Sequence, residues 1–338
     1  MPDEPLLEQL LAQPVPAVVE AMSALEGDIV VLGAGGKMGP SLVRLAARSL
    51  REAGRRSRVI AVARFSNPEL RATLEAEGIT TLRSDLVDPA QLARLPDASN
   101  IVYMVGQKFG TTGDEARTWA LNAWVPGAVA GRYARSRIVA FSTGNVYPLT
   151  PTDTNGPSET DPTGPVGEYA QSTLARERIL EFFSRRNGTP MAILRLNYAI
   201  EPRYGVLRDI ADRVRERRPV DVVMGWVNVI WQRDANAVAL RALGACTSPP
   251  LLLNVTGRPA VSVRWLAEQF GKRWNIQPRL AGAEAPTALL SDASRMEALF
   301  GPPEVGIDEM IARVAEWVER GGRSLNKPTH FESREGTF

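Results

Sequence analysis

The segment of residues 33–39, GAGGKMG, has glycines at the spacing of a dinucleotide-binding turn. It follows the apolar run of residues 28–32, which is typical of a buried parallel strand, and it opens a helical stretch at residues 41–49. Glycine at three positions allows a tight turn, close approach of the backbone to a pyrophosphate and close packing of the helix, whose N-terminus then holds the phosphates. The cofactor contacts predicted in this segment are Gly33, Gly36, Lys37, Met38 and Gly39.

A tyrosine at position 169, in the helical stretch YAQST, is the second candidate for chemistry. With the glycine segment, it makes the chain resemble the extended short-chain dehydrogenase/reductase family, the NAD-dependent epimerase/dehydratase group, over roughly residues 28–320. That family has Gly-x-x-Gly-x-x-Gly in its first turn, a Ser or Thr after the fifth strand, and Tyr-x-x-x-Lys on a helix. Where the family has the lysine, this sequence has Thr173. The resemblance implies an α/β fold, a Rossmann-type doubly wound parallel sheet with a smaller C-terminal substrate-binding lobe.

The resemblance also implies which hydroxyls carry the chemistry. The segment of residues 141–147 (FSTGNVY) is similar to the family's Ser-Ser-x-x-Val-Tyr, and alignment on Val146 and Tyr147 gives Thr143 the position of the catalytic hydroxyl. Thr143 would donate to a carbonyl or alkoxide oxygen while Tyr169 gives or takes the proton. A purely structural role for Thr143 is the alternative.

Thr173 completes the expected catalytic set, because residues four apart share one face of a helix. A lysine there would favour tyrosinate by its charge, whereas an uncharged hydroxyl does not. An unperturbed tyrosine titrates near pH ~10, so we expect Tyr169 to be a phenol at neutral pH. Such a group donates well for reduction and is a poor base for oxidation of an alcohol. Lys108 and Arg176 are the candidates for a substitute charge.

The second predicted strand ends at Arg64, not at the Asp or Glu that bonds a ribose 2′-hydroxyl. Because arginine pairs bidentately with phosphate, NADP is favoured over NAD, with stacking on adenine as the alternative role of Arg64. The resemblance further implies that Asp85 and Leu86 lie at the adenine and that Lys108 approaches the phosphates. Helix capping by Asp85 and a solvated loop position for Lys108 are the alternatives.

Substrate contacts are expected in the C-terminal half of the chain. The resemblance places Asn197 and Tyr198 at the pocket, while Trp226 and Trp231 either stack on a sugar or small ring or pack in the core.

The arginine that usually holds a substrate diphosphate in this family is replaced by Val227 or Asn228. Arg233 lies later, beside Asp234, where an ion pair is the simpler interpretation. The sequence therefore predicts a small-molecule substrate without a nucleotide diphosphate.

Composition argues against several classes of partner. The chain has 338 residues with 40 Lys plus Arg against 38 Asp plus Glu, a formal charge of +2, which gives no electrostatic case for nucleic acid or an anionic membrane. No stretch approaches the ~20 apolar residues of a membrane span, and the start lacks the features of a secretory signal, so we expect a cytoplasmic protein. A single cysteine, Cys246, and a single histidine, His330, predict neither a disulfide nor a metal site.

Apolar periodicity predicts the helices and strands, and the family resemblance then implies a division of the chain into four parts. Residues 1–27 are predicted to form an N-terminal helical extension of two short helices, and residues 28–200 a Rossmann domain to which a segment near residues 226–257 returns. Residues 201–320 are mainly the substrate-binding lobe, and residues 321–338 a C-terminal tail. After the first strand, strands are predicted at residues 58–63, 79–83, 100–105, 137–142 and 191–196, a loop at residues 148–165, and a closing helix at residues 307–318.

These features predict an NAD(P)-dependent oxidoreductase that acts on a hydroxyl or keto group of a small carbohydrate-like molecule. Family resemblance favours a homodimer. A sugar epimerase that uses transient oxidation is the alternative enzyme. A catalytically silent NADP-binding or sensor protein, which has kept the fold and lost turnover, is the alternative from another class.

Overall fold

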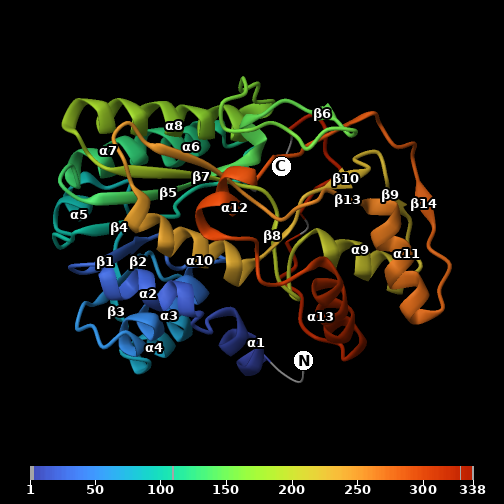
Figure 1. Ribbon diagram of the computed structural model, residues 1–338, viewed down its shortest axis with the longest axis horizontal. Helices are drawn as coiled ribbons and strands as arrows, with labels where there is room; N and C mark the ends of the chain where they lie inside the picture. Colours follow the sequence, from blue (N-terminus) through green and yellow to red (C-terminus); the bar gives the residue numbers. More distant parts are fainter. Residues whose placement is uncertain (1–3, 109, 328, 337–338) are drawn as a thin grey trace.

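The computed structural model describes residues 4–108, 110–327 and 329–336 (Figure 1). Within these residues, seven parallel strands form one central sheet in the order β12-β7-β5-β4-β1-β2-β3. The predicted Rossmann-type α/β fold is confirmed, and every predicted strand is present. The strands are β1 (Ile29–Leu32), β2 (Val59–Ala63), β3 (Thr80–Arg83), β4 (Asn100–Tyr103), β5 (Arg137–Thr143), β7 (Met191–Leu196) and β12 (Leu251–Val255).

The order of the strands reverses beside β1. The chain runs outward from β1 to β3 and then returns to β4 on the other side of β1. At such a switch point the loops that leave the two strands part, and a crevice opens at the carboxyl ends of the strands. The glycine segment follows β1, so it lies at this crevice.

Helices cover both faces of the sheet. Alternate residues of β1 point in opposite directions, Ile29 and Val31 into one apolar core and Val30 and Leu32 into another. The first core is covered by α2 (Pro16–Ala24), α3 (Gly39–Glu52), α4 (Pro68–Ala76) and α10 (Gln232–Ala242), the second by α5 (Pro89–Ala93), α7 (Val125–Arg132) and α8 (Gly167–Asn187). Ahead of α7 lie α6 (Glu115–Trp119) and the π-helical η1 (Ala120–Trp124). The 3-10 turn η2 (Gly144–Val146) follows β5, and the 3-10 turn η3 (Leu243–Ala245) follows α10.

A smaller lobe forms around a third apolar core that includes Phe270 and Trp317. In Figure 1 it lies beside the sheet, and Phe331 of the C-terminal tail is fully buried in it. The helices of this lobe are α9 (Val206–Arg215), α11 (Val263–Trp274) and α13 (Ile307–Glu319), with α12 (Ser294–Phe300) between the lobes. Short strand pairs join β8 (Ala199–Ile200) to β11 (Ile230–Trp231), β9 (Val220–Asp221) to β14 (Leu280–Ala281), β10 (Trp226–Val227) to β13 (Val261–Ser262), and β6 (Thr150–Pro151) to β15 (Thr287–Ala288). No helix among the described residues is long and apolar enough to cross a membrane.

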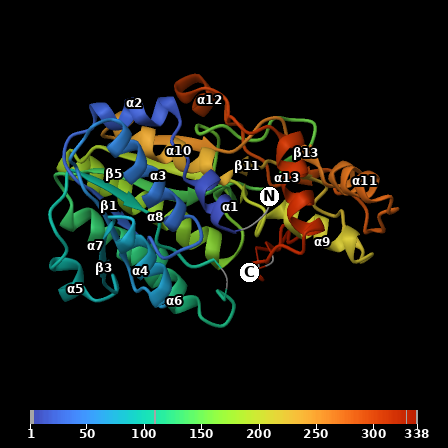
Figure 2. The same cartoon turned by 90° about the horizontal axis from the view of Figure 1, so that it is seen from below.

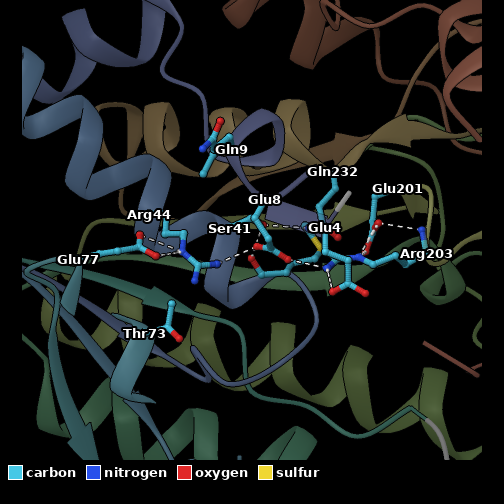
Figure 3. Close-up of polar contacts among 12 residues, drawn as sticks. Glu4, Glu8, Gln9, Ser41, Arg44, Thr73, Glu77, Glu201, Arg203 and Gln232 are labelled. Atoms are coloured by element: carbon cyan, nitrogen blue, oxygen red, sulfur yellow. Dashed lines mark hydrogen bonds and ion pairs between the residues drawn. The ribbon is translucent and has the colours of Figure 1, made fainter. Parts of the chain in front are cut away.

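The N-terminal helix α1 (Glu4–Leu11) connects the two lobes. Figure 2 shows it between α3 and the helices of the smaller lobe, whose core includes Leu7 and Leu11. The Glu8 carboxylate accepts from Arg44 of α3 at 2.8 Å on one oxygen and from Arg203 at 2.6 Å on the other (Figure 3). One side chain thus ties the glycine-turn helix to the segment that follows β8.

Candidate functional site

The turn between β1 and α3 has the shape that a dinucleotide requires. Gly33 has a φ of +92°, and a Cβ there would lie 2.9 Å from the backbone nitrogen of Val105. At Gly39, where α3 begins, a Cβ would collide with the carbonyl group of Ala34. Because only glycine fits at both positions, the backbone bends tightly and the N-terminus of α3 faces the crevice. This cradle fits a pyrophosphate, which the N-terminus of α3 would hold.

A cavity of about 250 Å³ lies on the β2 side of the turn. Arg64 is exposed at its edge, directly after β2. Asp85 accepts a hydrogen bond from the Val87 backbone at 3.2 Å, whereas Asp88 caps α5, so the alternative that Asp85 caps this helix is wrong. The predicted cofactor residues that line this cavity are Gly33, Gly36, Arg64, Asp85 and Leu86.

A second cavity, of about 280 Å³, lies on the β5 side and shares Gly33 and Gly36 with the first. Five elements converge on it: the start of α3, the loop after β4, the end of β5, the first turn of α8 and the residues that follow β7. The predicted site residues brought together here are Lys37, Met38, Gly39, Lys108, Thr143, Tyr169, Asn197 and Tyr198. Thr173, Trp226 and Trp231 are not among its lining residues.

Tyr169 and Thr143 face this second cavity from different elements. Thr143 ends β5, and its hydroxyl donates to the side-chain oxygen of Asn145 at 2.9 Å. Burial raises the pKa of Tyr169, against the opposing effects of hydrogen bonding to Thr143 and of the nearby Arg176 charge. Tyr147, by contrast, has its hydroxyl between Arg195 and Asn254 in the interior. Of these two tyrosines, only Tyr169 lines the cavity.

Thr173 is buried one turn after Tyr169. Its hydroxyl donates to the Tyr169 carbonyl at 2.8 Å, a bond within the helix itself. It brings no charge to the tyrosine. The predicted catalytic role of Thr173 stays a prediction.

Two lysines stand in the second cavity. Lys37 donates to the Ala199 carbonyl at 2.8 Å and lies 3.3 Å from the centre of the Tyr204 ring, and burial lowers its pKa to about 7. The Lys108 ammonium lies 5.8 Å from the centre of the Tyr169 ring, and burial lowers its pKa to about 8. The alternative of a solvated loop lysine at position 108 is wrong. Sequence reasoning missed Tyr204, which stands in no motif.

The loop that carries Lys108 is held by Asn122 of η1. The Asn122 side chain accepts from the Gln107 backbone nitrogen at 2.8 Å and donates to the Gln107 carbonyl at 2.9 Å. A buried amide that makes both bonds fixes the loop against the helix.

The two predicted substrate tryptophans lie elsewhere. Trp231 is 1 % exposed and packs in the core of the smaller lobe under the Arg313 guanidinium, so its role as a substrate contact is corrected to core packing. Trp226 lines a separate cavity of about 460 Å³ together with Trp265. An indole is large enough to satisfy either role, and only its neighbours decide which one it takes. The described residues contain no cluster of His, Cys, Asp and Glu that could hold a metal ion.

The glycine turn, the reversed strand order and the tyrosine helix define a Rossmann-type dinucleotide-binding protein. Residues 29–235 match the model of the NAD dependent epimerase/dehydratase family, and the chain belongs to that family. Comparison with curated proteins finds no significant match.

Solved structures share the fold at low sequence identity. WbmG of Bordetella bronchiseptica, in complex with NAD and UDP, is 19% identical, with a TM-score of 0.72 over 90% of this chain and 99% of that one. UDP-glucuronic acid 4-epimerase of Bacillus cereus, with NAD, is 16% identical, with a TM-score of 0.70 over 87% and 99%. UDP-glucose 4-epimerase of Thermus thermophilus, with NAD, is 20% identical, with a TM-score of 0.69 over 86% and 98%.

Proposed function

We propose that this protein is an NAD(P)-dependent oxidoreductase that acts on a hydroxyl or keto group of a small carbohydrate-like substrate. One observation carries the proposal: the hydroxyls of Tyr169 and Thr143 line the same cavity as the glycine turn. A nicotinamide dinucleotide held by that turn supplies or accepts hydride. The protein's part is to orient the reacting oxygen and to move its proton.

The chemistry follows from the state of the tyrosine. Burial raises the pKa of Tyr169, so at neutral pH the group is a phenol. For reduction, the phenol gives its proton to the carbonyl oxygen as hydride reaches the carbonyl carbon, while the Thr143 hydroxyl orients that oxygen. For oxidation, Tyr169 must first lose its proton, so we expect the oxidation rate to rise into alkaline pH.

The proposed substrate lacks a nucleotide diphosphate. Val227 is fully buried, and Asn228 is buried with its amide bonded to the Gly257 carbonyl and the Ser291 backbone nitrogen, so neither offers a charge to phosphate. Arg233 pairs with Glu304 at 2.7 Å. A cavity of about 280 Å³ that also receives the nicotinamide end favours a small sugar, sugar acid or polyol.

A sugar epimerase is the second candidate, favoured by the family and by the structural similarity to the UDP-sugar 4-epimerases. A catalytically silent NADP-binding protein is the third. We further propose cytoplasmic location and a homodimer, the latter supported by exposed Trp119, Trp124 and Phe182 on α6, η1 and α8.

A substrate panel tests the proposal. Neutral sugars, sugar acids, polyols and UDP- or GDP-sugars are each mixed with NADP or NAD, and stabilisation against heat and the absorbance of the reduced cofactor are measured. We expect small carbohydrates to be turned over and Tyr169→Phe to lower the rate by roughly 10²–10⁴-fold. Tyr133→Phe, which removes a phenol bonded to the Pro96 carbonyl away from the cavity, is the matched control.

Other outcomes identify the rivals. Product formed without net change in reduced cofactor indicates an epimerase. Cofactor binding with no product from any compound indicates a silent binding protein. Strong stabilisation by nucleotide sugars alone contradicts the small substrate.

A further inference from the structure

Arg176 is a buried arginine on the tyrosine helix. It follows Tyr169 by seven residues and Thr173 by three, so the three residues share one face of α8. Long side chains on a helix lean toward its N-terminus, which brings the Arg176 guanidinium back toward the turn that carries Thr173. Arg176 is 5 % exposed and lines the same cavity as Tyr169.

Neutral oxygen atoms hold this guanidinium. Nη1 donates to the Phe141 carbonyl at 2.6 Å, Nε to the Asn122 carbonyl at 3.1 Å, and Nη2 to the Asn122 side chain at 3.0 Å. Gly106 leaves the space that the group needs, because a Cβ there would lie 2.8 Å from Nη2. The guanidinium is therefore fixed in place at the wall of the cavity.

No ion pair between Arg176 and a carboxylate occurs among the described residues. The neighbouring Glu177 pairs with Arg195 at 2.7 Å instead and accepts from Ser142. Buried charges are ordinarily compensated, and an uncompensated one costs several kcal/mol. The cavity thus contains a positive charge for which the part of the interior that the structure describes provides no carboxylate.

We propose that the positive charge of the Arg176 guanidinium stabilises the tyrosinate form of Tyr169. Arg176 lies one helical turn further along α8 than position 173, and its charge takes the place of the lysine that is absent there. The inference rests on the proposed function. In alcohol oxidation the substrate hydroxyl proton passes to the Tyr169 oxygen and hydride leaves the carbon for the bound dinucleotide. Arg176 acts through Tyr169 and is a positioning residue.

Other titratable groups face Tyr169. Lys108 approaches from the loop after β4, and the phenols of Tyr198 and Tyr204 approach from the segment after β7. The Arg176 charge lowers the pKa of Tyr169 against the larger effect of burial. Because burial lowers the pKa of Lys108 to about 8, that cation is lost in the alkaline range where Tyr169 titrates. An arginine keeps its charge there.

The experiment is a site-specific titration of the full-length protein. A fluorinated tyrosine at position 169, whose phenol is more acidic than that of tyrosine, gives a ¹⁹F signal whose midpoint is measured against pH. In Arg176→Met we expect the midpoint to rise by roughly one to three pH units. In the double variant Thr173→Lys/Arg176→Met we expect it to return to the wild-type value. Arg178→Met, an exposed arginine on the same helix, is the matched control and should leave the midpoint unchanged.

An unchanged midpoint in folded Arg176→Met overturns the proposal. If that variant does not fold, the double variant decides. A midpoint of the double variant equal to the wild-type value supports the proposal, because the lysine then only restores the charge that Arg176 had supplied. A midpoint well below the wild-type value overturns it, because the lysine then adds a charge effect and the loss of Arg176 removes none. The titration needs no substrate, so failure of the proposed function leaves its result intact.

Discussion

On the β2 side of the glycine turn the crevice is lined by the turn itself, by apolar side chains, by Asp85 and by exposed Arg64, whereas on the β5 side it contains three long cationic side chains. The latter are Lys37, Lys108 and Arg176, which come from three different elements. The two cavities are of similar size, about 250 and 280 Å³. The difference between them lies in buried charge and not in volume.

This difference predicts how each side responds to change. The glycine turn binds a pyrophosphate because it leaves space for it, and that space does not change with pH. Buried ammonium groups bind by charge, and burial has moved their pKa values toward neutrality. We therefore expect substitutions in the turn to change affinity at every pH, and substitutions of the lysines to change its pH dependence.

The largest expected effect is on the backbone side. Gly36 is exposed, and a Cβ there would approach only the Gly33 carbonyl, at 3.3 Å, so Gly36→Val should fold. The valine methyl groups would occupy the space that a pyrophosphate needs, and we expect dinucleotide affinity to fall at least about 100-fold, or about 3 kcal/mol. Calorimetric titration with NADP at pH 6.5 and pH 8 measures it.

Gly244→Ala is the matched control for this change, because a Cβ at Gly244 would meet no atom within 4 Å. The midpoint of thermal unfolding without ligand should be nearly the same for the wild type, Gly36→Val and Gly244→Ala. If Gly36→Val lost affinity for NADP at only one of the two pH values, the distinction between the β2 side and the β5 side of the crevice would be wrong.

The backbone side is also the side that sequence predicts well. The strand at residues 28–32 and the spacing of Gly33 and Gly39 are local patterns, and local patterns fix the turn. The lysine contacts are not local. Lys37 meets the Ala199 carbonyl across 162 positions of sequence, and the contact depends on where the fold places β8.

The reaction side was predicted in part. Family motifs drew attention to Tyr169 and Thr143, which do share a cavity, although their catalytic roles stay predictions. Trp231 was named as a substrate contact with core packing as the alternative, and it lies in the core, because the sequence around an indole does not show which neighbours the fold brings to it. Arg176 was named as a possible charge, but sequence could not place its guanidinium.

A smaller effect is expected on the choice between NADP and NAD, at the exposed edge of the cavity on the β2 side. Arg64 stands where an acidic residue would repel a 2′-phosphate, so NADP(H) should bind more tightly than NAD(H). A charge-assisted pair contributes about 1.5 to 3 kcal/mol, hence a preference of roughly ten- to hundredfold that shrinks in Arg64→Ala. Equal affinities in the wild type, measured by calorimetry, would refute the assignment. Arg83→Ala, an exposed arginine at the end of β3, is the control.

The smallest expected effect is the pH dependence that Lys37 gives to binding. Burial lowers its pKa to about 7, against the attraction of Glu201. A bound pyrophosphate favours the protonated form, so the complex takes up a proton wherever the free protein has lost it. The affinity for the dinucleotide should therefore fall as pH rises above 7, by roughly fivefold between pH 7 and pH 8.

Lys37→Met should reduce this fall to roughly twofold between pH 7 and pH 8 and leave the fall above pH 8 that comes from Lys108. Calorimetry in two buffers of different ionisation enthalpy counts the proton directly, and Lys272→Met, an exposed lysine on α11, should take up the same amount as the wild type. An unchanged proton uptake in Lys37→Met would mean that its ammonium does not interact with the bound phosphates. The β5 side of the crevice would then owe its electrostatic response to Lys108 and Arg176.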